Sequence, residues 1–258
     1  MEGGVGVERP LKLYMLPFLS PGHMIPLGDI AVMFASQGQQ VTIITTPANV
    51  HFFTKSLSSV DPFFLRLHTV DLPSQQVGLP DGVESLSSTT HKIYVGSKLL
   101  HAPVRDFIEK DPPDYIIGDC VYPWIHDLAN KPHISTIAFT GYSLFSVSLI
   151  ESLRVHRSNH YTNSSSFVVP NFPHAITFSS GPPKTFITFE ENMLKTILKS
   201  KRLIINNFAE LDGVDCIKHY DKTMGHKAWH LGPACLIHKI VQRKLRGGMR
   251  AWLACTNV

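Results

Sequence analysis

Two side chains capable of acid–base chemistry each follow a short apolar stretch of this chain. His23 comes just after the apolar run from Leu11 to Phe18, and Asp119 ends the run DYIIGD that starts at Asp114. A neutral imidazole can take the proton from a hydroxyl group, and a carboxylate bonded to its other ring nitrogen stabilises the imidazolium that forms. His23 and Asp119 are therefore a candidate general-base pair.

The apolar run before His23 has the length and boundaries of an inner strand in a parallel sheet. Pro21 and Gly22 mark a turn, after which apolar residues from Ile25 to Phe34 repeat with helical spacing. His23 is therefore expected at the carboxyl end of a strand, beside a helix N-terminus, where open α/β sheets bind ligands. The positive end of that helix disfavours an imidazolium, so we expect the ring to stay neutral and able to accept a proton.

Each of these two residues also has a purely structural interpretation. His23 could cap the following helix or fill a gap beside it, and Asp119 could cap a helix that starts at Pro123. Position in the sequence leaves both interpretations open.

Strand-like and helix-like segments alternate along the chain. After the first strand and helix, strands are expected at 40–46, 63–69, 114–119, 132–139 and 203–207. Helices are expected at 48–57, at 92–109, from Tyr122 onward and at 189–200, with polar connections at 71–90 and 156–166. This alternation predicts an α/β fold with a doubly wound, mostly parallel sheet.

Composition and charge argue against several classes of protein. The chain has 258 residues with 24 basic and 20 acidic side chains, a net charge of +4, and no nucleic-acid partner is expected. The N-terminus lacks the pattern of a signal peptide, and the most apolar window, 137–150, is too short to span a bilayer. Four scattered cysteines predict a reducing, cytoplasmic compartment without a disulfide framework.

Signatures of other chemistries are missing from the sequence. The turn from Ser20 to His23 is not a GxGxxG motif, and neither a P-loop, a GxSxG elbow nor an HExxH motif occurs. The 14 histidines show no zinc-ligand spacing, so no metal ion is expected.

Several motifs, in order along the chain, resemble those of the plant family 1 UDP-sugar-dependent glycosyltransferases. The pentapeptide Gly22–Pro26 matches the GHMxP-like sequence after the first strand of that family, and Asp119–Trp124 matches its D-x-x-x-P-W context. Further matches are Gly78–Gly82, the segment Asn207–Leu211, and Lys227–Pro233, and the resemblance extends to about Ile237.

The resemblance implies a fold and a set of residue roles. Residues 1–237 would form the N-terminal, acceptor-binding, Rossmann-like domain of a GT-B enzyme, with His23 as general base and Asp119 as its partner. The family transfers a sugar from a UDP-sugar, which is a co-substrate, to an acceptor hydroxyl with inversion and without a metal ion. Thr140 would lie near the transferred sugar, and the other residues expected to bind substrate are Gly22, Met24, Trp124 and Tyr142. The sequence of this half most resembles that of the family members that act on triterpenoid saponins and flavonoids.

The chain departs from the family after Ile237. The donor-binding signature of the family's second domain, which begins W-A-P-Q and contains H-C-G-W-N-S, is missing. Residues 238–258 are expected to contain the start of the linker and a disordered, out-of-frame tail, and we hypothesise a single-base frameshift. Without the donor domain, we expect this chain by itself to transfer no sugar. The alternatives are an acceptor-binding module and a non-functional truncated product.

Overall fold

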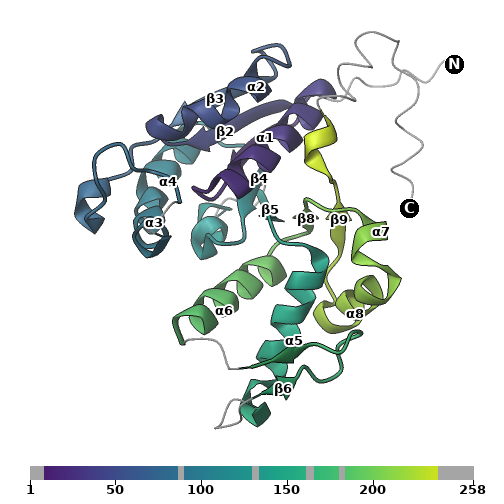
Figure 1. The fold of residues 1–258 in the computed structure, drawn as a ribbon. Coiled ribbons are helices and arrows are strands. Elements are labelled where there is room, and N and C mark those ends of the chain that lie inside the picture. The colour runs from purple at the N-terminus through teal and green to yellow at the C-terminus, as the bar shows by residue number, and fades with distance from the viewer. Residues whose placement is uncertain (1–8, 87–89, 130–133, 161–165, 180–183, 238–258) are drawn as a thin grey trace, which may run out of the picture.

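A computed structural model describes residues 9–86, 90–129, 134–160, 166–179 and 184–237 (Figure 1). Within these residues, a sheet of seven strands has the order β3-β2-β1-β4-β5-β8-β9, and every neighbouring pair is parallel. The strands are β1 (Lys12–Leu16), β2 (Gln40–Thr45), β3 (Leu65–Thr69), β4 (Tyr115–Asp119), β5 (Ser135–Thr140), β8 (Leu203–Ile205) and β9 (Ala228–His230). The predicted mostly parallel α/β sheet is confirmed. The tail expected at 238–258 lies outside the described residues.

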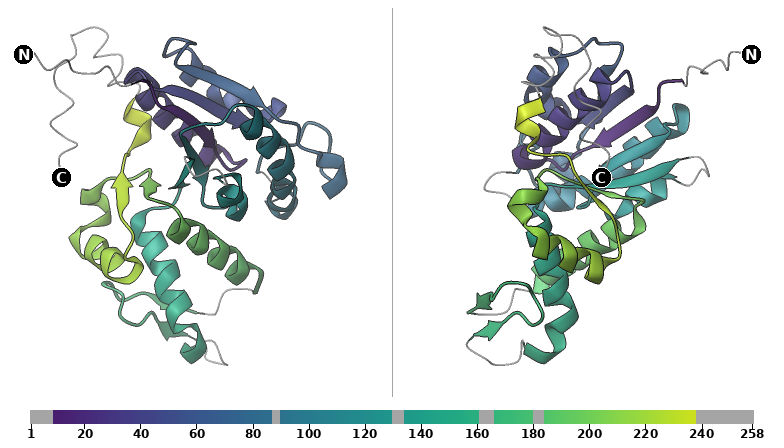
Figure 2. Two further views of the ribbon diagram at one scale, coloured as in Figure 1. Left: turned by 180° about the vertical axis from the view of Figure 1, so that it is seen from behind. Right: turned by 90° about the vertical axis from the view of Figure 1, so that its right-hand side faces the viewer.

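The helices cover both faces of this sheet. The α-helices are α1 (Pro21–Ser36), α2 (Thr54–Leu57), α3 (Thr90–Ser97), α4 (His101–Lys110), α5 (Leu144–His160), α6 (Lys184–Lys199), α7 (Ala209–Asp212) and α8 (Val214–Met224). Short 3-10 segments are η1 (Pro47–Phe53), η2 (Ser74–Val77), η3 (Lys98–Leu100), η4 (Pro123–Ala129) and η5 (Ala234–Leu236). A two-stranded antiparallel hairpin, β6 (Phe167–Val168) with β7 (Thr177–Phe178), lies beside the end of α5 away from the sheet (Figure 2).

The core follows from the alternation of side chains along the strands. Leu13 and Met15 of β1 face a cluster that includes Leu27 and Ile30 of α1. Tyr14 and Leu16 face the opposite cluster, together with residues of α3, α4 and η4. Because the strands are buried on both faces, they read in the sequence as continuous apolar runs.

Several predicted helices differ from the structure. The segment 48–57 is mostly the 3-10 segment η1, and 92–109 is divided by η3 into α3 and α4. The helix expected from Tyr122 is the 3-10 segment η4, and α5 continues to His160 through the first half of the loop expected at 156–166. Helix α8 was not predicted, although Cys216, Tyr220 and Met224 are buried at the four-residue spacing of one helix face.

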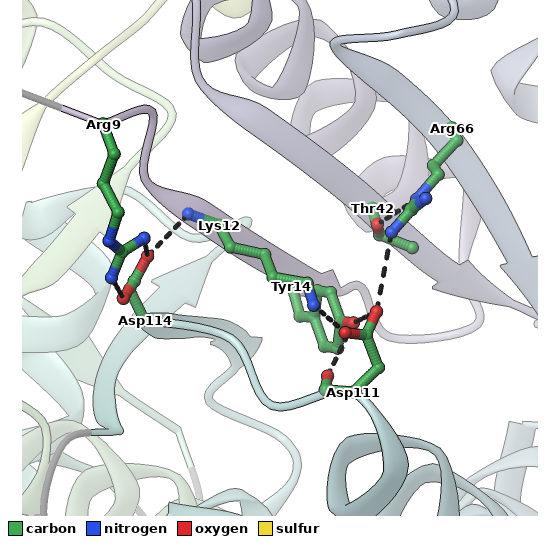
Figure 3. Close-up of polar contacts among 7 residues, drawn as sticks. All are labelled: Arg9, Lys12, Tyr14, Thr42, Arg66, Asp111 and Asp114. Carbon is green, nitrogen blue, oxygen red and sulfur yellow. Dashed lines mark hydrogen bonds and ion pairs between the residues drawn. The ribbon is translucent and has the colours of Figure 1, made fainter.

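An ionic network joins β1 to the chain before β4 at the amino ends of these strands (Figure 3). Asp114 accepts hydrogen bonds from the Lys12 backbone N–H at 2.8 Å and from Arg9 at 2.9 and 2.5 Å. Asp111 pairs with the Lys12 ammonium, lies 3.6 Å from Arg66 and accepts the hydroxyl of buried Tyr14 at 2.7 Å. The hydrogen bond from Lys12 is the largest cause that holds the pKa of Asp111 below its ordinary value. We name Arg9, Lys12, Asp111 and Asp114 the register clamp. They hold β1 against β4 at the amino ends of these strands, whereas His23 and Asp119 lie at the carboxyl ends.

Candidate active site

The topology of the sheet brings His23 and Asp119 together. Strands β1 and β4 are neighbours in the sheet. The strands β2 and β3 lie on one side of this pair, and β5, β8 and β9 lie on the other, so the strand order reverses here and a crevice opens at the carboxyl ends of β1 and β4. His23 lies in the first turn of α1, directly after β1, and Asp119 is the last residue of β4. His23 Nδ1 lies 2.6 Å from Asp119 Oδ2, so two residues 96 positions apart form one pair.

The carboxylate of Asp119 is held in a fixed orientation. Its side chain is fully buried, and Oδ2 accepts the Phe18 backbone N–H at 3.3 Å while Oδ1 accepts the Val121 N–H at 3.1 Å. Buried carboxylates need such donors, because a charge without partners in an apolar interior is costly. Asp119 is therefore a rigid acceptor for the imidazole.

This contact sets the tautomer of His23. An ionised carboxylate only accepts hydrogen bonds, so Nδ1 carries the proton and donates it to Oδ2. Nε2 is then unprotonated in the neutral ring. The arrangement leaves one nitrogen of a neutral imidazole available as a proton acceptor.

The pKa of His23 is raised above its ordinary value of 6.5. Burial is the largest single influence and lowers the pKa, but the charge of Asp119 and the hydrogen bond to it together outweigh burial. We expected the helix N-terminus to lower the pKa of His23 and keep the ring neutral. This expectation is wrong, because the pKa is raised. The helix N-terminus is close, yet a full negative charge at 2.6 Å is stronger than the partial charge of a helix end.

This raised pKa predicts a particular dependence of stability on pH. Because the folded state holds the His23 proton more tightly than the unfolded state does, the pair stabilises the fold fully below pH 6.5. The stabilisation is lost as the pH rises through the folded-state pKa. Replacing Asp119 with Asn leaves burial as the largest influence, so the pKa of His23 is expected to fall below 6.5. NMR titration of the His23 ring in both proteins measures this reversal, and an unchanged pKa in the Asn variant would contradict it.

The ring of His23 is 15% exposed and has aromatic neighbours. Phe18 lies edge-on to it, with the ring centroids 5.6 Å apart, and Tyr142 lies edge-on at 6.2 Å. Burial is the largest cause that raises the pKa of Tyr142 above its ordinary value, followed by the charges of Cys120 and Asp119. Tyr142 therefore stays a neutral phenol beside the imidazole.

The remaining predicted substrate-binding residues divide into two groups. Gly22 is exposed in the first turn of α1, beside His23. Thr140 is fully buried at the end of β5, where its Oγ1 accepts the Tyr142 N–H at 3.1 Å. Met24 and Trp124 belong to the core clusters on opposite faces of the sheet. Their contact with a substrate stays a prediction.

Sequence reasoning missed two residues of the site, Phe18 and Gly141. Phe18 could have been found as the last aromatic residue of the apolar run, two positions after the end of β1 and before the turn at Ser20. Gly141 follows β5 and carries no motif in the sequence, although a Cβ built on it lies 3.4 Å from His23 Nε2. Within the described residues, no group of three or more His, Cys, Asp and Glu side chains could hold a metal ion. In the same part of the chain, no helix has the length and apolar character needed to cross a membrane.

Plant glucosyltransferases are similar to this chain over most of its length. UDP-glucosyl transferase 73CC6 of Saponaria officinalis is 37% identical over 246 residues, which cover 90% of this chain and 50% of the relative. UDP-glucose flavonoid 3-O-glucosyltransferase 7 of Fragaria ananassa is 32% identical, over 93% of this chain and 51% of the relative. This chain therefore spans about half the length of the curated relatives that it matches. No protein-family model matches it.

Solved structures share the fold. Glycyrrhiza uralensis UGT73P12, complexed with glycyrrhetinic acid 3-O-monoglucuronide, has a TM-score of 0.75 at 32% identity, over 88% of this chain and 50% of that one. Arabidopsis thaliana UGT89C1, complexed with quercetin, has a TM-score of 0.68 at 22% identity. At this identity, the similarity concerns the fold alone.

Proposed function

Because this chain belongs to the plant UDP-glycosyltransferases, we propose that it is the acceptor-binding half of an enzyme that transfers a sugar from a UDP-sugar to a small molecule. The proposed acceptor is a hydroxyl of a plant specialised metabolite, a triterpenoid saponin or a flavonoid. The names of the relatives and the glycyrrhetinic acid derivative bound to the Glycyrrhiza structure support this substrate class. The unpaired cysteines among the described residues, Cys120, Cys216 and Cys235, fit a reducing cytoplasm.

The proposed mechanism assigns one proton transfer to His23. Nε2 takes the proton of the acceptor hydroxyl as its oxygen attacks the anomeric carbon of the sugar on the face opposite UDP. The new C–O bond forms, the bond to the UDP oxygen breaks with its electron pair leaving on UDP, and the anomeric configuration inverts. Asp119 stabilises the imidazolium that results.

The observation that carries this proposal is the 2.6 Å contact between His23 Nδ1 and Asp119 Oδ2 at the switch point of the sheet. It leaves Nε2 free at the place where a ligand is expected. Thr140 is expected near the transferred sugar, and the other residues expected to bind substrate are Gly22, Met24, Trp124 and Tyr142.

Binding and turnover by the chain itself test the proposal. We expect a saponin aglycone or a flavonoid to raise the thermal midpoint of unfolding in a saturable manner, because a ligand that binds only the folded state stabilises it. We expect no transfer from UDP-glucose, UDP-galactose or UDP-xylose, because the donor has to be held in line with the acceptor oxygen at about 3–3.5 Å.

Two results would count against the proposal in different ways. The absence of any shift with a panel of triterpenoid and flavonoid acceptors would refute acceptor binding and favour a non-functional product. Measurable transfer by the chain alone would refute the assignment of residues 1–237 to the acceptor half. Saturable binding without transfer supports an acceptor-binding module.

A further inference from the structure

The side of the His23 ring that carries Nε2 faces the backbone of Gly141. Asp119 occupies Nδ1 at 2.6 Å, and the rings of Phe18 and Tyr142 stand nearly perpendicular to the imidazole, with centroids 5.6 and 6.2 Å away. A Cβ atom built on Gly141 lies 3.4 Å from both Nε2 and Cε1 of His23. The missing side chain at position 141 is therefore what leaves space beside the free nitrogen.

We propose that Gly141 is the residue that gives an acceptor hydroxyl access to the base, and that a side chain at this position excludes bulky acceptors. This inference rests on the proposed function for its ligand, and on the structure of the chain for its geometry. Gly141 does not react itself. It acts through the space that it leaves next to His23.

The distances place a side chain at 141 beside the approach of an acceptor oxygen to the base. A hydroxyl that gives its proton to Nε2 has to approach to about 2.6–3.2 Å. A methyl group at 3.4 Å from both Nε2 and Cε1 lies beside the bond between them, and a larger side chain extends from there toward that approach. The methyl group would also lie 3.3 Å from the carbonyl oxygen of Gly22. Since that oxygen belongs to the backbone of α1, the methyl group has little freedom to move away.

Backbone conformation does not explain the glycine. The glycines with a left-handed φ among the described residues are Gly38, Gly78, Gly82, Gly213 and Gly225. Gly141 is not one of them, so alanine is compatible with its backbone. The Tyr142 N–H bond to Thr140 Oγ1 fixes the turn around it without using a side chain at 141. Two physical reasons for glycine remain, the close approach of the Gly22 carbonyl oxygen and the space beside the Cε1–Nε2 edge of His23.

The space that Gly141 leaves beside His23 Nε2 also indicates which acceptors fit. A hydroxyl on a ring carbon brings neighbouring ring atoms with it, and these need room next to the base. Glycine at 141 provides this room, so the inferred class is a secondary alcohol or phenol on a fused ring system. A larger side chain at 141 would restrict the base to hydroxyls on slender, unbranched carbons.

Chemical labelling of the histidines tests access to Nε2 without relying on catalysis. Diethyl pyrocarbonate acylates an unprotonated imidazole nitrogen, and peptide mass spectrometry gives a rate for each histidine. His51 is the matched internal reference, because its Nδ1 is also occupied, by the Ala48 carbonyl oxygen at 2.8 Å, and its side chain is exposed. The measured quantity is the ratio of the His23 rate to the His51 rate, at a pH above the NMR-determined pKa of His23.

We expect Gly141→Val to lower this ratio by on the order of tenfold or more, and Gly141→Ala to lower it by less. A side chain at 141 buries the His23 ring further, and burial lowers its pKa, so each variant is labelled at a pH above its own NMR-determined pKa. An unchanged ratio in the valine variant, with its circular dichroism unchanged, would overturn the inference. If valine prevents folding, an unchanged ratio in the alanine variant overturns it.

Acceptor binding in the same variants separates this inference from the proposed function. Loss of the thermal shift with a triterpenoid aglycone in Gly141→Val, with the shift retained for a slender primary alcohol, supports the inference. Equal shifts in the variant and the unaltered chain contradict the inference and leave the proposed function standing. If no acceptor shifts the unaltered chain while the labelling ratio still falls, the proposed function fails and the access role of Gly141 holds.

Discussion

Alanine at position 23 is expected to lower kcat by about 10²–10⁴-fold in an enzyme completed with a donor-binding half. The design joins residues 1–237 of this chain to the unmatched part of the Saponaria officinalis relative, which is 37% identical over the half that this chain covers. The proton of the acceptor hydroxyl then has no base within reach, while the acceptor still contacts its other neighbours. The KM for the acceptor is therefore expected to change much less than kcat.

Two further variants make this experiment specific. Asp119→Asn retains the shape of the carboxylate but removes its charge, so kcat is expected to fall less than in His23→Ala, and the pH at which activity appears should fall with the pKa of His23. His51→Ala removes an exposed histidine with no contact to the site and should leave kcat unchanged. A His23→Ala enzyme with unaltered kcat would refute the role of His23 as base.

Gly232→Ala is expected to destabilise the fold by about 3 kcal/mol or more, the largest single effect on stability that we predict. A Cβ atom at 232 would lie 2.5 Å from the backbone nitrogen of Asn207 and 2.6 Å from the carbonyl carbon of Asn206. Both are backbone atoms directly after β8, and the Gly232 N–H donates to the Asn207 carbonyl oxygen at 3.0 Å. The clash therefore cannot be relieved without separating the chain after β9 from the chain after β8.

Thermal and urea unfolding measure this effect, with a midpoint expected roughly 10 °C lower for a domain of this size. Gly22→Ala is the matched control, because a Cβ there has nothing within 4 Å and the residue lies in the first turn of α1. Its stability should stay within about 0.5 kcal/mol of the unaltered chain. Equal stability of the two alanine variants would mean that the close approach at Gly232 carries no energetic weight.

The strands and the proximity of His23 and Asp119 could be predicted because both depend on sequence patterns that extend over only a few residues. Apolar runs between turn residues locate β1 and β4, and the carboxyl ends of parallel strands meet at one edge of the sheet. That argument places His23 and Asp119 near each other before any coordinates are known. The 2.6 Å contact confirms their proximity, and their catalytic role stays a proposal.

The features that were missed depend on distances across the fold. Gly141 is important for what lies opposite it, the ring of His23 from another element, and a sequence carries no such distance. The direction of the pKa shift of His23 was wrong for the same reason, because the helix end was visible in the sequence and the strength of the Asp119 contact was not. The division of 92–109 into α3 and α4 through η3 has a local cause instead, because Pro103 has no N–H to donate to the carbonyl oxygen of Leu99 and disfavours one continuous helix.

The register clamp has a consequence for how this fold can change at its other end. Arg9, Lys12, Asp111 and Asp114 hold β1 against β4 at the edge of the sheet remote from the reactive histidine. Insertions and deletions in the loops around the ligand crevice can therefore accumulate over generations without sliding one strand past the other. Selection, or a protein engineer, can reshape those loops for a new small molecule while the pairing of His23 with Asp119 is inherited intact.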